Sequence, residues 1–66
     1  MIGREIKLER MNKGLSQEKL AEKAGVHRTY ISLIERNIKS PTINVFIRIC
    51  NGLNIKPSTI LKRLGK

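Results

Sequence analysis

The fold of this chain is decided by residues 16–37, which read SQEKLAEKAGVHRTYISLIERN. Ser16 is a favourable N-cap, and the apolar spacing after it predicts a helix over 17–24 that Gly25 ends. A second helix is predicted over 28–36, after a three-residue turn that begins at Gly25. Two short helices that meet at so tight a turn are typical of a helix-turn-helix.

Three more helices are predicted outside this stretch, over 3–12, 43–53 and 57–64. Thr42 is a good N-cap for the middle one, and Pro57 suits the first position of the last one. Two prolines and five glycines interrupt a sequence that otherwise has the character of helix. The sequence therefore predicts an all-α, compact five-helix fold, and 66 residues allow one domain over 1–66.

The last two predicted helices carry more apolar side chains than one small core needs. The face of helix 43–53 that we expect to be buried consists of Ile43, Phe46, Cys50 and Leu53. Other apolar residues of these helices then point elsewhere, and an exposed apolar surface often marks an interface. We therefore expect a homodimer. Its expected interface residues are Val45, Ile49, Ile60 and Leu64.

The charge of the chain favours a polyanionic partner. Fourteen basic and five acidic residues give a net charge of +9. The excess is uneven, because residues 36–66 hold seven bases and no acid, whereas residues 1–35 hold seven bases and all five acids. Nucleic acid or an anionic membrane would fit this field, and an aid to solubility is the plainer alternative.

Several classes of protein lack support in the composition. Cys50 is the only cysteine, so an internal disulfide is excluded, and a small buried hydrophobe is its expected role. With His27 as the only histidine and no aspartate, neither a metal site nor an acid–base pair is expected. We expect no enzyme activity, cofactor, small-molecule ligand, membrane span or signal peptide, and a cytoplasmic location in a prokaryotic cell or a phage-encoded protein.

The start of helix 28–36 has side chains suited to reading bases. Arg28 can donate two hydrogen bonds to a guanine, and such a pair is worth about 1–3 kcal/mol of discrimination. Thr29 can contact a base edge, and Leu33 suits thymine methyl groups, although a stray exposed leucine is the alternative. Tyr30 either contacts a phosphate or packs on the scaffold. The remaining polar candidates for phosphate contacts are Ser32, Arg36, Asn37 and Lys39, and also His27, whose alternative is to cap the helix.

The stretches LSQEKLAEKAGVHRTYISLIERNIKSP, from residue 15, and INVFIRICNGLNIKPSTIL, from residue 43, resemble the lambda-repressor-like, or Xre-type, regulators. The resemblance covers about residues 3–62. Within that family, the segment HRTYISLIERN is particularly similar to restriction–modification controller proteins. The resemblance implies a lambda-repressor-like fold with the helix-turn-helix at helices two and three. It also implies a transcriptional regulator that binds double-stranded DNA as a homodimer on a pseudo-palindromic operator.

The resemblance also implies roles for individual residues. Gln17 matches a glutamine that contacts a phosphate and supports the recognition helix. Arg10 and Glu35 match an ion pair between the first and third helices, for which the alternative is two solvated charges. The positions at which the family reads bases are occupied by His27, Arg28, Thr29 and Leu33. Asn37 stands where the family often has glycine.

Two other functions compatible with these features are a DNA-binding antitoxin and a non-specific nucleic-acid binder. The antitoxin would act mainly by binding a partner toxin, but no segment suited to wrapping a toxin is visible here. The non-specific binder would explain the charge of +9 and would leave Arg28, Thr29 and Leu33 unexplained. A sequence-specific regulator accounts for both features.

Overall fold

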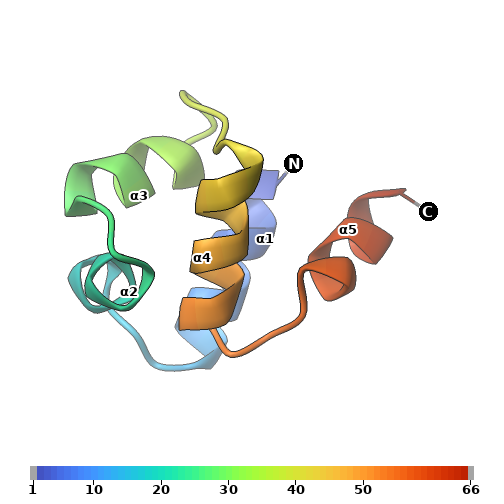
Figure 1. Ribbon diagram of the computed structural model, residues 1–66, viewed down its shortest axis with the longest axis horizontal. Coiled ribbons are helices and arrows are strands. Elements are labelled where there is room, and N and C mark those ends of the chain that lie inside the picture. The colour runs from blue at the N-terminus through green and yellow to red at the C-terminus, as the bar shows by residue number, and fades with distance from the viewer. Residues whose placement is uncertain (1, 66) are drawn as a thin grey trace.

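Five helices follow one another along residues 2–65, the part of the chain that the computed structural model describes. They are α1 (Ile2–Asn12), α2 (Gln17–Ala24), α3 (Arg28–Glu35), α4 (Ile43–Gly52) and α5 (Pro57–Gly65). These residues include no strand, which confirms the all-α prediction, and each helix end lies within one residue of the predicted end. In Figure 1, α4 lies between the pair α2–α3 on one side and α5 on the other, with α1 behind it.

The expected capping residues define the helix ends. The hydroxyl groups of Ser16 and Thr42 accept hydrogen bonds from backbone N–H groups three residues later, at 3.0 and 3.2 Å. Gly25 and Asn37 have positive φ angles of 72° and 59°, in the left-handed region that glycine and asparagine tolerate best. None of the helices within 2–65 is long and apolar enough to span a membrane.

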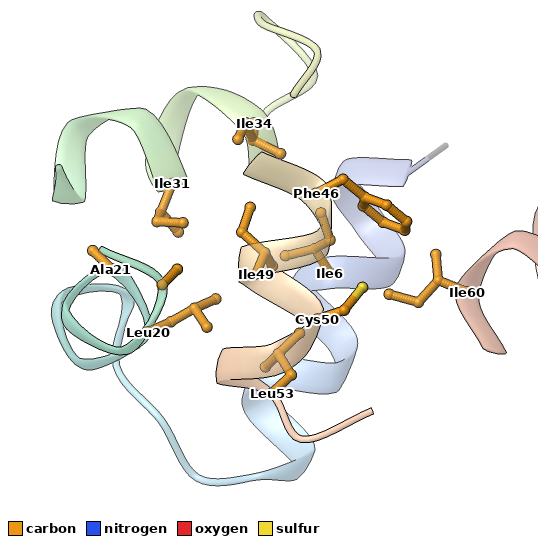
Figure 2. Close-up of a cluster of buried hydrophobic side chains, with 11 residues drawn as sticks. Ile6, Leu20, Ala21, Ile31, Ile34, Phe46, Ile49, Cys50, Leu53 and Ile60 are labelled. Atoms are coloured by element: carbon orange, nitrogen blue, oxygen red, sulfur yellow. The ribbon is translucent and has the colours of Figure 1, made fainter. Parts of the chain in front are cut away.

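One apolar core joins all five helices, as the close-up in Figure 2 shows. It consists of Ile6, Leu20, Ala21, Ala24, Ile31, Ile34, Phe46, Ile49, Cys50, Leu53 and Ile60. The helix-turn-helix contributes its predicted inward residues, Ile31 and Ile34, and Val26 packs against them from the turn. Because α2 and α3 both pack on this core, the position of the second helix is fixed relative to the rest of the chain.

The buried face of α4 differs from the predicted one. Phe46, Cys50 and Leu53 are buried as expected, but Ile43 is 69% exposed, and Ile49 is fully buried in its place. Ile49 completes a stripe at i, i+3, i+4 and i+7 that begins at Phe46, whereas Ile43 lies in the first turn of α4, before that stripe. Apolar spacing alone did not distinguish these two registers.

The expected interface residues are also partly corrected. Ile49 and Ile60 lie in the core with no exposed area, so neither offers a surface to a second copy of the chain. Val45 is half-buried against the core, and Leu64 is 38% exposed. The large apolar side chains that α4 and α5 do leave exposed are Ile43, Ile47, Leu61 and Leu64. We call these four residues the α4–α5 apolar surface.

Candidate nucleic-acid interface

The turn between α2 and α3 is fixed by backbone hydrogen bonds. The N–H of Gly25 donates to the carbonyls of Ala21 and Glu22 at the end of α2, and the N–H of Val26 donates to the carbonyl of Ala21 at 3.0 Å. The left-handed conformation of Gly25 allows the chain to reverse there without steric cost from a Cβ atom. The end of α2 and the direction in which the chain leaves it are therefore set locally, by residues 21–26.

His27 is the N-cap of α3. Its Nδ1 accepts a hydrogen bond from the N–H of Thr29 at 3.0 Å. The sequence left open whether His27 caps the helix, and in the structure it does. An Nδ1 acceptor leaves the Nε2 of the neutral ring as a donor, and His27 is exposed. Capping and a contact with a partner are thus compatible at this side chain.

The start of α3 borders a shallow groove on the surface. Its lining residues are Ser16, Glu18, Lys19, Ala21, Glu22, Val26, His27, Arg28 and Thr29. Arg28 and Thr29 are exposed, and Arg28 forms no ion pair within residues 2–65. The guanidinium of Arg28 is thus available to a partner at a helix N-terminus, where the positive end of the helix dipole also favours anions.

The end of α3 is held by a buried polar network. The Nε and Nη2 atoms of Arg10 donate to the two carboxylate oxygens of Glu35 at 2.7 and 3.1 Å. The third donor of Arg10, Nη1, binds the carbonyl of Leu15 at 2.8 Å. The Glu35 side chain is 2% exposed and that of Arg10 is 12% exposed, so the solvated alternative does not apply. The pair between the first and third helices that the sequence predicts is present.

Gln17 belongs to the same network. Its Nε2 donates to the Oε1 of Glu35 at 3.0 Å, which joins the start of α2 to the end of α3. The support that the family resemblance implied for this glutamine is therefore visible as a hydrogen bond. An amide NH₂ group carries a second hydrogen besides the one donated to Glu35.

The other predicted contact residues lie along the outer side of α3 and in the loop after it. Ser32 and Leu33 are half-buried, and so is Tyr30, which packs against the core. Arg36 and Lys39 are exposed in the loop, and Arg36 caps the end of α3.

Asn37 has a structural contact that the sequence analysis missed. Its Oδ1 accepts a hydrogen bond from the N–H of Gly3 at 3.3 Å, so the loop after α3 binds the first turn of α1. A Cβ atom on Gly3 would lie 2.1 Å from the carbonyl oxygen of Ile34 and 2.7 Å from the Oδ1 of Asn37. The close approach of α1 to α3 therefore requires glycine at position 3.

Outside this region, two groups have a raised pKa. Hydrogen bonds to Glu9 and Glu5 raise the pKa of Arg63, and burial raises the pKa of the Cys50 thiol to about 11, so Cys50 stays protonated at neutral pH. Within residues 2–65, no three His, Cys, Asp or Glu side chains lie close enough together to hold a metal ion. The candidate site is the start of α3, because its exposed polar groups border the groove.

Comparison with known proteins gives matches over nearly the same residues. A family model described as Helix-turn-helix matches residues 6–60. The HTH-type transcriptional regulator SinR of Bacillus subtilis is 44% identical over 62 residues, which cover 92% of this chain and 56% of SinR. The control protein C.SmaI of Serratia marcescens is 43% identical over 51 residues, which cover 77% of this chain and 61% of C.SmaI. This chain thus spans little more than half the length of these two relatives.

Two solved structures have a similar fold. The crystal structure of SinR in complex with DNA has a TM-score of 0.86 and 44% identity, and the match covers 92% of this chain and 98% of that chain. The restriction-modification controller protein C.AhdI of Aeromonas hydrophila has a TM-score of 0.87 and 30% identity, with 89% of each chain covered.

Proposed function

Because this chain belongs to the Xre-type helix-turn-helix family, we propose that it is a sequence-specific transcriptional regulator that binds double-stranded DNA. Its α3 would lie in the major groove, as the second helix of this motif does in its known complexes. Two copies would bind a pseudo-palindromic operator. The proposal describes a binding protein without catalytic chemistry.

The observation that carries this proposal is the contrast between the two ends of α3. The C-terminal end is fixed by Glu35, which is buried and bound to α1 and α2. The N-terminal end exposes Arg28 and Thr29 beside a shallow groove. A rigidly held helix with free polar side chains at its start can present them to base edges at a reproducible depth and angle.

We assign the base contacts to His27, Arg28, Thr29 and Leu33. Arg28 would donate to the O6 and N7 atoms of a guanine, and Thr29 would contact a base edge. The Nε2 of His27 is a further donor, and the half-buried Leu33 would cover thymine methyl groups.

The phosphate contacts are assigned to Gln17, Tyr30, Ser32, Arg36, Asn37 and Lys39. Arg36 and Lys39 are the exposed cations of the loop, so they are suited to follow the DNA backbone. Gln17 would use its remaining amide hydrogen. Asn37 would use its amide N–H₂ group, because its oxygen already binds the N–H of Gly3.

We place the homodimer interface on the α4–α5 apolar surface, with Val45 at its edge. The four exposed side chains of this surface come from two neighbouring helices, and packing a second copy against them would remove them from water. An interface of a few residues is small, so we expect the homodimer to dissociate in the micromolar range. Binding of both copies to one operator would stabilise the dimer further.

Selection of bound DNA from a random pool, followed by sequencing, tests the whole proposal. We expect a palindromic consensus with half-site centres about one helical turn apart, near 34–36 Å. Two variants separate the classes of contact: Arg28→Ala should lose preference at one base pair of each half-site, and Lys39→Ala should weaken all sequences alike and lower the salt dependence. A pool without an enriched motif, or an unchanged motif with Arg28→Ala, would contradict the proposal.

A further inference from the structure

The last helix is attached to the rest of the molecule by few contacts. Ile60 is the one residue of α5 with a fully buried side chain, and Figure 2 shows it pointing from α5 towards the core near Cys50. Leu61 and Leu64 are exposed on the α4–α5 apolar surface. A helix with a single fully buried side chain is only weakly fixed in its angle, so a second strong contact matters for its orientation.

Arg63 supplies that second contact. Its Nη2 donates to the Oε2 of Glu9 at 2.5 Å, and its Nη1 donates to the Oε1 of Glu5 at 3.1 Å. Glu5 and Glu9 are four residues apart on α1 and thus neighbours on one face of that helix. The two Nη atoms of one planar guanidinium therefore bind two carboxylates along the axis of α1, which fixes both the distance and the direction of α5.

The Glu9 carboxylate makes this contact difficult to replace with water. The side chain of Glu9 is only 10% exposed, and Arg63 is its ion-pair partner within residues 2–65. A nearly buried carboxylate without a cation is costly, so without Arg63 we expect α5 to move and admit water to Glu9. The geometry set by the ion pair is then lost.

The contact of Arg63 is also connected to the recognition helix. Glu9 and Arg10 are consecutive residues of α1, and Glu9 binds α5 while Arg10 binds Glu35 at the end of α3. The helix α1 thus carries an ion pair to each of the two elements whose relative position matters in a dimer. Of these two elements, α5 would form part of the interface with the partner copy, and α3 would enter the DNA.

We propose that Arg63 is a positioning residue that fixes α5 on α1 and thereby sets the half-site spacing that the dimer accepts. This inference rests on the proposed homodimer through the α4–α5 apolar surface. The rise of DNA is about 3.4 Å per base pair, and a displacement of α5 is doubled by the symmetry of a dimer. One base pair of spacing therefore corresponds to a shift of about 1.7 Å and a rotation of about 17° in each copy, because DNA turns by about 34° per base pair.

The test compares Arg63→Ala with Lys62→Ala, which removes the same charge from an exposed neighbouring residue of α5. Operators are made with the selected half-sites at the preferred spacing and at spacings one and two base pairs longer and shorter. We expect wild type and Lys62→Ala to bind the operator with the preferred spacing about tenfold more tightly than operators one base pair longer or shorter. For Arg63→Ala we expect this difference in affinity to be less than about threefold. Affinity for an isolated half-site should agree among all three proteins to within about twofold.

A second measurement needs no DNA. Hydrogen exchange of the α5 amides in the free protein should be at least about tenfold faster in Arg63→Ala than in Lys62→Ala, while the α2 and α3 amides stay unchanged. Arg63→Lys retains the charge but binds a single carboxylate at a time, so it should lie between the two. It also serves if Arg63→Ala proves unstable.

The outcomes separate the two proposals. If wild type shows no spacing preference, the proposed dimer is wrong, and the exchange rates alone then decide whether Arg63 fixes α5. If Arg63→Ala retains the wild-type spacing preference, or if it weakens an isolated half-site as much as the full operator, Arg63 does not set the spacing. Unchanged exchange in α5 would overturn the positioning role itself.

Discussion

Replacing Glu35 by alanine should destabilise the protein far more than replacing one of its exposed glutamates would. Glu35 accepts three hydrogen bonds, two from Arg10 at 2.7 and 3.1 Å and one from Gln17 at 3.0 Å, with a side chain that is 2% exposed. The substitution leaves the guanidinium of Arg10, 12% exposed, with the carbonyl of Leu15 as its remaining partner.

The size of the loss follows from this geometry. Removing one partner of a buried ion pair typically costs about 3–5 kcal/mol, and the partial exposure of Arg10 places the expected loss at the lower end, about 3 kcal/mol. A chain of this size has a total stability of about 3–10 kcal/mol. The melting temperature should therefore fall by more than about 10 °C.

The assay is urea unfolding followed by far-ultraviolet circular dichroism, with the matched control Glu22→Ala. Glu22 also accepts from a cation, the Nζ of Lys19 at 3.2 Å, but both side chains are more than half exposed. The control should therefore cost less than about 1 kcal/mol. Replacing both members of the buried pair, with Arg10→Met and Glu35→Leu, should recover much of the loss, because no unpaired charge is then buried.

Two results would refute this reasoning. If Glu35→Ala and Glu22→Ala cost the same within about 0.5 kcal/mol, burial does not strengthen the pair. If Arg10→Ala and Glu35→Ala are additive in a double-mutant cycle, the short distances in the structure do not represent coupling.

Four further predictions concern other parts of the molecule. Arg28→Ala should cost about 1–3 kcal/mol on the selected operator in fluorescence anisotropy, and an equal loss on random DNA would contradict base reading. Gly3→Ala should lower the free energy of unfolding in urea by about 1–3 kcal/mol, because its Cβ would lie 2.1 Å from a backbone carbonyl of α3. The control Gly65→Ala places its Cβ in open space, and equal stabilities of the two variants would disprove the close approach of α1 to α3. Burial raises the pKa of the Cys50 thiol from 9.0 to about 11, so the unfolded state loses this proton before the folded state does. The free energy of unfolding, measured in urea, should therefore fall as the pH rises from 9.0 to about 11. Cys50→Ala should remove this part of the fall, and a pH profile that Cys50→Ala leaves unchanged would contradict the prediction. Ile47→Lys should give a monomer in sedimentation experiments with unchanged helix content, and a dimer that persists would place the interface elsewhere.

Local signals predicted most of the fold. The caps Ser16 and Thr42 and the left-handed Gly25 are properties of a few neighbouring residues, and all three are present. The sequence was least informative where distant segments meet. The contact of Gly3 with Asn37 joins residues 34 positions apart, and no local pattern indicates it.

The buried face of α4 shows why spacing alone is insufficient. Ile43 and Ile49 both fit an apolar helical pattern with Phe46, and which one is buried depends on where the neighbouring helices lie. The ion pair of Arg10 with Glu35 was reached through a family resemblance, and the contacts of Arg63 were missed. The sequence did hold a signal for the contact of Arg63 with Glu9. Glu9 falls on the same face of α1 as the buried Ile6, and a carboxylate on a buried face needs a partner.

The distribution of charge separates attraction to DNA from the reading of its sequence. The groove at the start of α3 contains Glu18 and Glu22 beside Lys19 and Arg28, so its formal charges nearly cancel. The basic excess lies in residues 36–66, which have seven bases and no acid. Attraction to phosphates should therefore come mainly from the loop after α3 and from the helices beyond it.

A non-specific binder would concentrate its cations where it contacts DNA, because salt-dependent attraction is then its whole binding energy. Here the acids Glu18 and Glu22 lie next to Arg28, and they oppose any phosphate that approaches without a compensating base contact. Under the proposed function, binding at this groove should therefore depend on the base that Arg28 meets. The charge of the chain as a whole would attract a polyanion, and the groove at the start of α3 would select among sequences.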